Sequence, residues 1–219
     1  MALNKLKFNS LNVTPTAGKT VGFNSDADGL EATFSGGAMT FIKKLTASSS
    51  GTLSFVDGAS SVVLDSTYKE YIFIFNNIHP ATDNVDFTFN GSTDSGSNYN
   101  VTKTTTYIEA YHNESDTTTS LEYNGTWDLA QSTSAQKIAV QIGSDNDESF
   151  SGTLSLFNPS STTFVKHFNS NINEYHHSNY TLQALVGGYL NTTSAVDAVQ
   201  FKMSSGNIES GTITLYGIN

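Results

Sequence analysis

The chain has 219 residues, a formal net charge of −10 and no cysteine, and all ten of its basic residues are lysine. Disulfides and thiolate metal sites are therefore excluded, and the lack of arginine and of clustered cations argues against nucleic acid or an anionic membrane as a partner. Hydrophobic residues make up 37% of the chain and charged residues 14%, which is too apolar for disorder and, with few strong helix formers, predicts an all-β protein.

The first segment, Met1–Ser35, is predicted to be an attachment arm. It alternates short apolar pieces with Asn, Thr and Gly, and such a piece cannot close a hydrophobic core alone. The apolar residues expected to dock on a neighbouring protein are Leu3, Leu6, Phe8, Leu11 and Val13. The alternative is that the segment forms the first hairpin of the following domain. The opening residues lack the apolar core of a secretory signal, and we expect no membrane insertion.

From Gly36 to Asn219 the sequence predicts one antiparallel β-sandwich or jelly-roll domain, because short apolar segments recur about every eight to twelve residues with turn residues between them. In Tyr71–Phe75 both faces are apolar, as in a central strand, whereas in Val85–Phe89 apolar and polar residues alternate. A short turn of helix is expected after Trp127. Further strands are expected at 39–47, 50–58, 105–111, 136–144, 150–160, 162–171, 180–190, 197–207 and 208–218.

The phrase Ser-Gly-Thr occurs three times before apolar residues, at 50–52, 151–153 and 210–212. Its irregular spacing argues against a solenoid or a propeller. Glycine lets the backbone turn, and threonine favours extended structure. We therefore interpret the phrase as a signal for strand entry and not as a repeated binding site.

Two groups of residues are candidates for holding a metal ion. The acidic turn with Asp145, Asp147 and Glu148 and the loop with Asp83 and Asp86 offer oxygen ligands of the kind that calcium takes, but the spacing of an EF-hand loop is missing. Adjacent His176 and His177 would point to opposite faces of an extended strand, and their spacing suggests no third ligand. We expect neither a metal site nor another cofactor.

Catalytic motifs are missing as well. The sequence has no Gly-x-Ser-x-Gly elbow, no His-Glu-x-x-His zinc motif and no phosphate-binding glycine loop. A carboxylate pair for glycoside hydrolysis is defined by its separation in space, which the sequence leaves open. We predict that the protein is not an enzyme.

Aromatic residues in the polar central region are candidates for binding glycans. They lie beside Asn, Asp and Thr, and exposed aromatic rings with such neighbours form stacking platforms for sugars. The alternative is that they fill the core or a subunit interface. The candidates are Tyr99, Tyr107, Tyr111, Tyr123 and Trp127.

Several segments resemble a group of virion proteins of tailed bacteriophages, best represented in phages of marine cyanobacteria. The match is carried by Tyr71, Phe73, Phe75, Ile78, the run Pro80–Asp83 and the terminal stretch Ile208–Gly217. The opening residues resemble the N-terminal leader of the group. Ser95 stands where the group often has glycine, which puts the form of that turn in doubt.

The resemblance implies a non-enzymatic structural component of a virion, either a tail-fibre-associated or a capsid-decorating protein, assembled in the host bacterial cytoplasm. It implies other virion proteins as partners and brings no catalytic residues to this chain. Strand addition by the arm and a cyclic homo-oligomer, with a trimer favoured, suit such a role. We further expect contact with host-surface polysaccharide. The alternatives are a carbohydrate-binding module and, less favoured, a glycan depolymerase.

Overall fold

The computed structural model describes residues 20–23, 30–33 and 38–218. The chain divides into two units, Met1–Ala38 and Met39–Asn219. In the first unit, β1 (Thr20–Phe23) pairs antiparallel with β2 (Leu30–Thr33). The apolar residues expected to dock this segment, Leu3 to Val13, lie outside the described residues.

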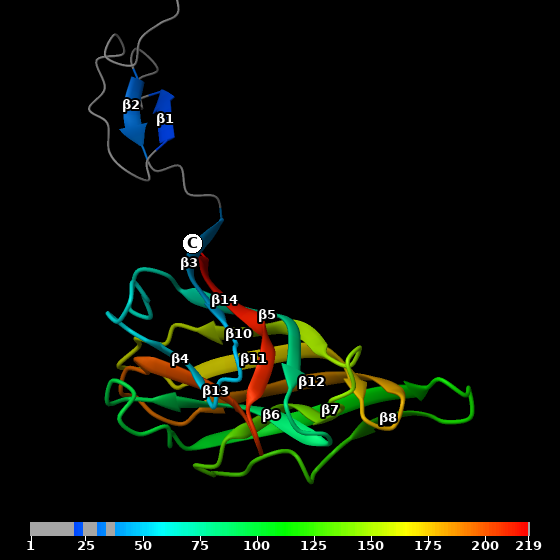
Figure 1. Cartoon of the computed structure of the whole chain (residues 1–219). Helices are drawn as coiled ribbons and strands as arrows, with labels where there is room; N and C mark the ends of the chain where they lie inside the picture. Colours follow the sequence, from blue (N-terminus) through cyan, green and yellow to red (C-terminus); the bar gives the residue numbers. More distant parts are fainter. Residues whose placement is uncertain (1–19, 24–29, 34–37, 219) are drawn as a thin grey trace, which may run out of the picture. The chain divides into compact units, whose positions relative to one another are not determined.

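The second unit is built from β-strands, and residues 38–218 contain no helix (Figure 1). All of its strand pairs are antiparallel, so the predicted fold class is confirmed. The segment between Trp127 and β9 has an irregular backbone with one isolated bridge from Ser132 to Lys103, and the helical turn expected there was wrong. The strands are β3 (Met39–Thr46), β4 (Leu53–Val56), β5 (Glu70–Pro80), β6 (Val85–Ser92), β7 (Lys103–Asn113), β8 (Thr119–Tyr123), β9 (Gln136–Ile142), β10 (Phe150–Phe157), β11 (Lys166–His176), β12 (Tyr180–Leu190), β13 (Ala198–Met203) and β14 (Ile208–Ile218).

The strands form two layers of a jelly-roll-like sandwich. The larger layer has the order β3-β14-β5-β10-β11-β12-β7-β8, and the smaller layer has the order β9-β6-β13-β4. One pairing between His176 of β11 and Ile142 of β9 joins the two layers along one edge. Neighbouring strands are often far apart in sequence, since β14 lies between β3 and β5.

Phenylalanine rings fill the space between the layers. Phe201 of β13 lies with its ring centroid 5.2 Å from those of both Phe73 and Phe75 on β5, and 5.8 Å from that of Phe87 on β6. All four side chains are buried to at least 99%. Burying each such ring contributes about 1.5–3 kcal/mol relative to leaving it exposed, so this cluster contributes substantially to the stability of the domain.

In β6, Val85, Phe87 and Phe89 are buried as predicted, but Thr88 on the opposite face is buried as well. The prediction of β5 as a central strand is confirmed, since it pairs with β14 on one side and β10 on the other. Tyr71, Phe73 and Phe75 are buried, whereas Ile72 and Ile74 on the opposite face are half-buried. The strand β8 was not predicted, because its short sequence, Thr-Ser-Leu-Glu-Tyr, lies within a long polar stretch. Its outer edge has no strand partner in the described part of the chain.

Two of the three Ser-Gly-Thr phrases lie inside strands and not at strand entry. Gly152 stands in β10 and Gly211 in β14, and next to both the register with β5 shifts, which indicates a β-bulge. A Cβ atom on Gly152 would lie 2.7 Å from the Cα of Ile172, and one on Gly211 would lie 2.7 Å from the Cα of Ile78. Gly51 precedes β4 and fits the prediction. The other two copies mark places where neighbouring backbones approach too closely for a side chain.

Candidate functional site

A cavity of about 320 Å³ lies on the inward side of β7, β8 and β12. The turn between Asn124 and Trp127 and the ends of β9 and β11 complete its wall. The backbone N–H of Trp127 donates to the carbonyl of Asn124 (3.3 Å) and closes this turn, and the backbone N–H of Asn124 donates to the carbonyl of Tyr107 (2.9 Å), which holds the turn against β7. The volume of the cavity lies at the lower end of the range for small-molecule sites, which is about 300–1,000 Å³.

Glu109 of β7 is the most deeply buried acid of this cavity, with 3% of its surface exposed. Asn124 Nδ2 donates to its Oε1 (3.2 Å), while its Oε2 is buried without a hydrogen-bond partner among the described residues. Burial raises the pKa of Glu109, the bond from Asn124 acts in the opposite sense, and Glu122 raises the pKa further. Glu122 is its direct partner across the β7–β8 pair.

Aromatic side chains form a second part of the wall. The ring centroid of Tyr180 lies 5.6 Å from that of Tyr111 and 5.2 Å from that of His176. Burial lowers the pKa of His176 to about 4, with a further contribution from His177. At neutral pH His176 is therefore uncharged, and the charged side chains of the cavity wall are carboxylates.

Trp127 is held between the cavity and the core. Its ring stands edge-to-face on Tyr107 with the centroids 5.2 Å apart, and Lys137 Nζ lies 5.9 Å from the centroid of its ring. Its carbonyl accepts from Gln136 Nε2 (2.9 Å). Several contacts thus fix the position of this tryptophan, as a binding platform requires.

The five aromatic candidates do not form one platform. Tyr111 and Trp127 line the cavity. Tyr107 is fully buried beneath Trp127 and belongs to the core, as the alternative interpretation proposed. Tyr123 is exposed, pairs with Ile108 across β7–β8, and donates its hydroxyl to Asp128. Tyr99 lies in the loop between β6 and β7, half-buried beside Gly96.

The acids of the cavity were not identified from the sequence. Glu109 stands two residues from both Tyr107 and Tyr111, so the period of a strand places it on the same face as two predicted candidates. That signal was available in the sequence. The partner Glu122 depends on the register of β7 with β8, which becomes visible only in the structure.

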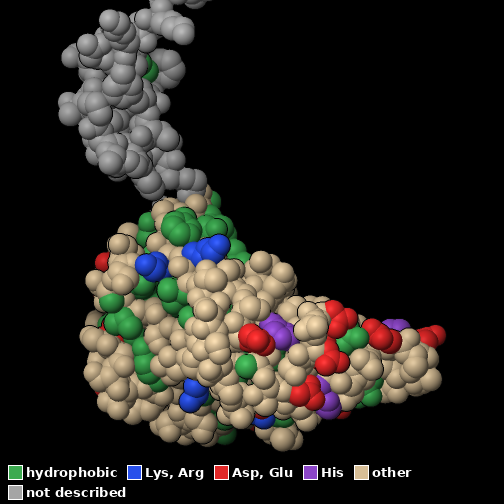
Figure 2. Space-filling view, viewed as in Figure 1, with side chains coloured by type: hydrophobic (Ala, Val, Ile, Leu, Met, Phe, Trp, Pro, Cys, Tyr) green, Lys and Arg blue, Asp and Glu red, His purple; other side chains and the backbone are tan. Residues whose placement is uncertain are grey.

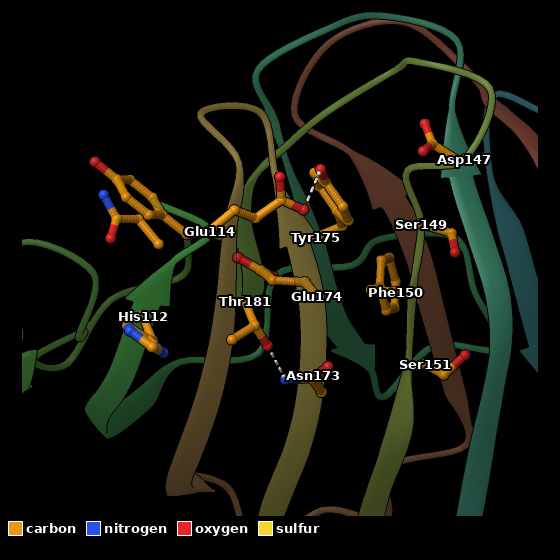
Figure 3. A pocket seen from close by; sticks show the side chains of 12 residues that line it. His112, Glu114, Asp147, Ser149, Phe150, Ser151, Asn173, Glu174, Tyr175 and Thr181 are labelled. Carbon is orange, nitrogen blue, oxygen red and sulfur yellow. Dashed lines mark hydrogen bonds between the residues drawn. The ribbon is translucent and has the colours of Figure 1, made fainter. Parts of the chain in front are cut away.

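A second hollow, of about 490 Å³, shares Tyr180 with the first cavity in its lining (Figure 3). Tyr175 donates its hydroxyl to Glu114 Oε1 (2.9 Å), and Asn173 Nδ2 donates to Thr181 Oγ1 (3.0 Å). Figure 2 shows Asp, Glu and His side chains gathered at the end of the domain that carries β7 and β8. This hollow combines hydrogen-bonding side chains with the rings of Phe150, Tyr175 and Tyr180.

Of the candidate metal ligands, Glu148 and His176 make hydrogen bonds within the protein. Glu148 is buried, and its Oε2 accepts from the backbone N–H of Asp145 (2.6 Å). His176 and His177 lie with their ring centroids 4.5 Å apart, because β11 ends at His176 and the chain turns there. Within the described ranges no three His, Asp or Glu side chains are grouped so that they could hold an ion.

Comparison of the chain with protein-family models, with curated proteins and with solved structures found no match. In the part of the chain that the structure describes, no helix has the length and hydrophobicity to cross a membrane.

Proposed function

We propose that the chain is a non-enzymatic structural component of a bacteriophage virion, a tail-fibre-associated or capsid-decorating protein. Met1–Ser35 docks it to other virion proteins, and the β-sandwich faces outward and contacts host-surface glycans. The particle assembles in the host cytoplasm. The phage assignment is supported by the resemblance of Tyr71–Asp83 and Ile208–Gly217 to virion proteins.

The observation that carries the binding role is the combination of groups in the cavity. Tyr111, Trp127 and Tyr180 supply aromatic surface, and Asn124 and Glu122 supply hydrogen-bonding groups beside it. Sugars have apolar C–H faces and polar rims, so they are recognised by such combinations of rings and polar side chains. The same combination supports the alternative of a free carbohydrate-binding module.

A glycan depolymerase is a further candidate, because two carboxylates face one cavity. Glu109 and Glu122 lie opposite each other, and burial raises the pKa of Glu109 in the sense that suits a general acid. Release of reducing sugar from bacterial polysaccharide, lost in Glu109→Gln, would establish this activity. We favour binding without cleavage, because the sequence contains no further catalytic motif.

Exposed apolar side chains on the outer face of the larger layer support self-association. Leu185, Ile108 and Tyr123 are successive partners across β12, β7 and β8, and they are 44%, 39% and 56% exposed. Leu121 on the free-edged strand β8 is 77% exposed. We propose that this face contributes to a homo-oligomer, with a cyclic trimer as the first state to test.

The docking role is tested by incorporation into particles. Full-length protein, a deletion of residues 1–35, and a full-length variant with Ser in place of Leu3, Leu6, Phe8, Leu11 and Val13 are supplied during phage growth. We expect full-length protein in purified particles and neither altered form, while circular dichroism shows that both altered forms remain folded. Particles that contain the deletion at the normal level would refute docking by the arm.

The glycan contact is tested separately on an array of bacterial polysaccharides. Tyr111→Ala and Trp127→Ala should each lose at least tenfold in binding, because each removes an aromatic surface of the cavity. Tyr123→Ala is the matched control, since this ring lies outside the cavity. Binding that survives both cavity variants would refute a glycan site at this position.

A further inference from the structure

Two carboxylates oppose each other in the cavity. Glu109 and Glu122 are direct partners across the antiparallel pair β7–β8, and both side chains line the cavity. Like charges at directly opposite positions destabilise a strand pair. The side chain of Glu109 also has one carboxylate oxygen that is buried and unpartnered within the described part of the chain. A cationic group bound between the two strands would relieve both disadvantages.

The remaining wall favours an organic cation over a metal ion. Rings from Tyr111, Trp127 and Tyr180 border the cavity, and aromatic faces attract ammonium groups. A hard metal ion such as calcium instead takes six to eight oxygen ligands. No cluster of three acidic or histidine side chains that could begin such a set is present in residues 20–23, 30–33 and 38–218. An ammonium group can use the carboxylates and the rings together.

An anionic ligand is disfavoured by the same arrangement. His176 borders the cavity but is buried and accepts the backbone N–H of Ser178 at its Nδ1 (3.1 Å). The side chains that bring formal charge to the cavity wall are Glu109 and Glu122. A glycan that carries carboxylates or phosphates would therefore meet like charge.

We propose that this cavity binds the ammonium group of an organic ligand, with Glu109 and Glu122 as the counter-charge and Tyr111, Trp127 and Tyr180 as the aromatic wall. This deepens the proposed glycan contact, and it rests on that proposal for the source of the ligand. An amino sugar with a free amine and a choline-bearing glycan share this chemistry. The volume of the cavity, about 320 Å³, is large enough for an ammonium group and the atoms next to it.

The test is isothermal titration calorimetry with two pairs of probes on the full chain at pH 7.5 and low salt. Glucosamine is compared with N-acetylglucosamine, in which the charge is removed, and choline with its neutral analogue 3,3-dimethylbutan-1-ol. We expect each cation to bind at least tenfold more tightly than its neutral counterpart. Binding of glucosamine alone identifies an amino sugar, and binding of both cations identifies a general ammonium site.

Three variants connect this preference to the residues. Glu109→Gln and Glu122→Gln should each weaken cation binding at least tenfold, whereas Asp145→Asn removes the same charge from an exposed loop and should change it less than twofold. Glu109→Gln should be at least as stable as the native chain, since burial already opposes the charged form. A residue with a purely structural role would instead lose stability. Should Glu109→Gln fail to fold, the more exposed Glu122→Gln provides the same readout.

Two results would overturn the inference. Equal affinity for N-acetylglucosamine and glucosamine would refute the ammonium preference and leave the proposed glycan contact intact. Absence of heat with every probe, or cation binding that persists in both glutamine variants, would show that the cavity is not an ammonium site. Neither result bears on docking to the particle, which incorporation of the deletion variant tests independently.

Discussion

Alanine at each of the three Ser-Gly-Thr glycines tests how the fold uses this phrase. The copies share their sequence but differ in backbone conformation and surroundings. Gly211 has a φ of 107°, a value that L-residues rarely adopt, whereas neither Gly51 nor Gly152 has a positive φ. A Cβ on Gly51 would lie 3.8 Å from the side chain of Asn207, which is an ordinary contact. The same substitution should therefore have three different effects.

The expected losses in free energy of unfolding follow from these geometries. Gly51→Ala should lie within about 0.5 kcal/mol of the native value, or raise it by up to about 1 kcal/mol through the unfolded chain. Gly152→Ala should cost about 1–3 kcal/mol, because its Cβ would press on the Cα of Ile172. Gly211→Ala combines such a clash with Ile78 and an unfavourable φ, and should cost about 2–6 kcal/mol.

Urea denaturation of the full chain, followed by tryptophan fluorescence and circular dichroism, measures the three values. The single tryptophan, Trp127, reports on the described domain. The order Gly211→Ala, Gly152→Ala, Gly51→Ala, from least to most stable, supports the geometric account. A loss at Gly51→Ala equal to that at Gly211→Ala would refute it, because the phrase would then act independently of close approach and backbone conformation.

Further predictions concern buried groups. Burial lowers the pKa of Lys103 to about 8, so between pH 8 and the ordinary value of 10.5 the folded state binds fewer protons than the unfolded state. This group should contribute about 3 kcal/mol of stability as the pH rises through that window. Lys103→Met should remove this contribution, measured as the difference between the two proteins in urea titrations, in which the shifts of Lys166, Tyr71 and Tyr107 cancel. The pKa of His176 is lowered to about 4 from 6.5, so the unfolded chain binds a proton more readily than the folded chain, and stability should fall as the pH falls from 6.5 to 4. The raised pKa values of Glu109 and Glu174 have the opposite effect, because the folded chain then binds protons more readily. The variant His176→Gln should therefore become more stable on acidification. Phe201→Ala should cost about 3–5 kcal/mol, and an unchanged melting temperature would contradict the assignment of the core.

Much of the fold follows from local patterns in the sequence. The alternation of Val85–Phe89 and the apolar run Tyr71–Phe75 predict β6 and β5, because burial on one or both faces imposes those patterns. The strand β8 escaped prediction because Leu121 and Tyr123 are exposed, and burial imposes no pattern on such residues. The bulges at Gly152 and Gly211 depend on neighbouring strands and leave no distinct local signal.

The site was predictable only in part for a related reason. Tyr111 and Trp127 were candidates for glycan binding because polar residues surround them in the sequence. The cavity that brings them together is formed by segments that are distant along the chain. The pairing of Glu109 with Glu122 depends on the hairpin between β7 and β8. A slip of one residue would turn Glu122 to the outer face. The sequence of either strand alone does not determine this register.

The end of the domain that holds the cavity carries several groups that burial disfavours in their charged form. The desolvation of Glu174 is partly offset by a hydrogen bond, since both of its carboxylate oxygens accept the backbone N–H of Val140. This contact also joins β11 to β9. His176 is neutral at pH 7 and accepts from Ser178. Glu109 has one oxygen for which the described part of the chain supplies no donor. Groups whose pKa is shifted by burial and whose hydrogen bonds are incomplete are concentrated at functional sites. Glu109 is therefore the residue of this cavity for which a role in binding is best distinguished from a role in folding.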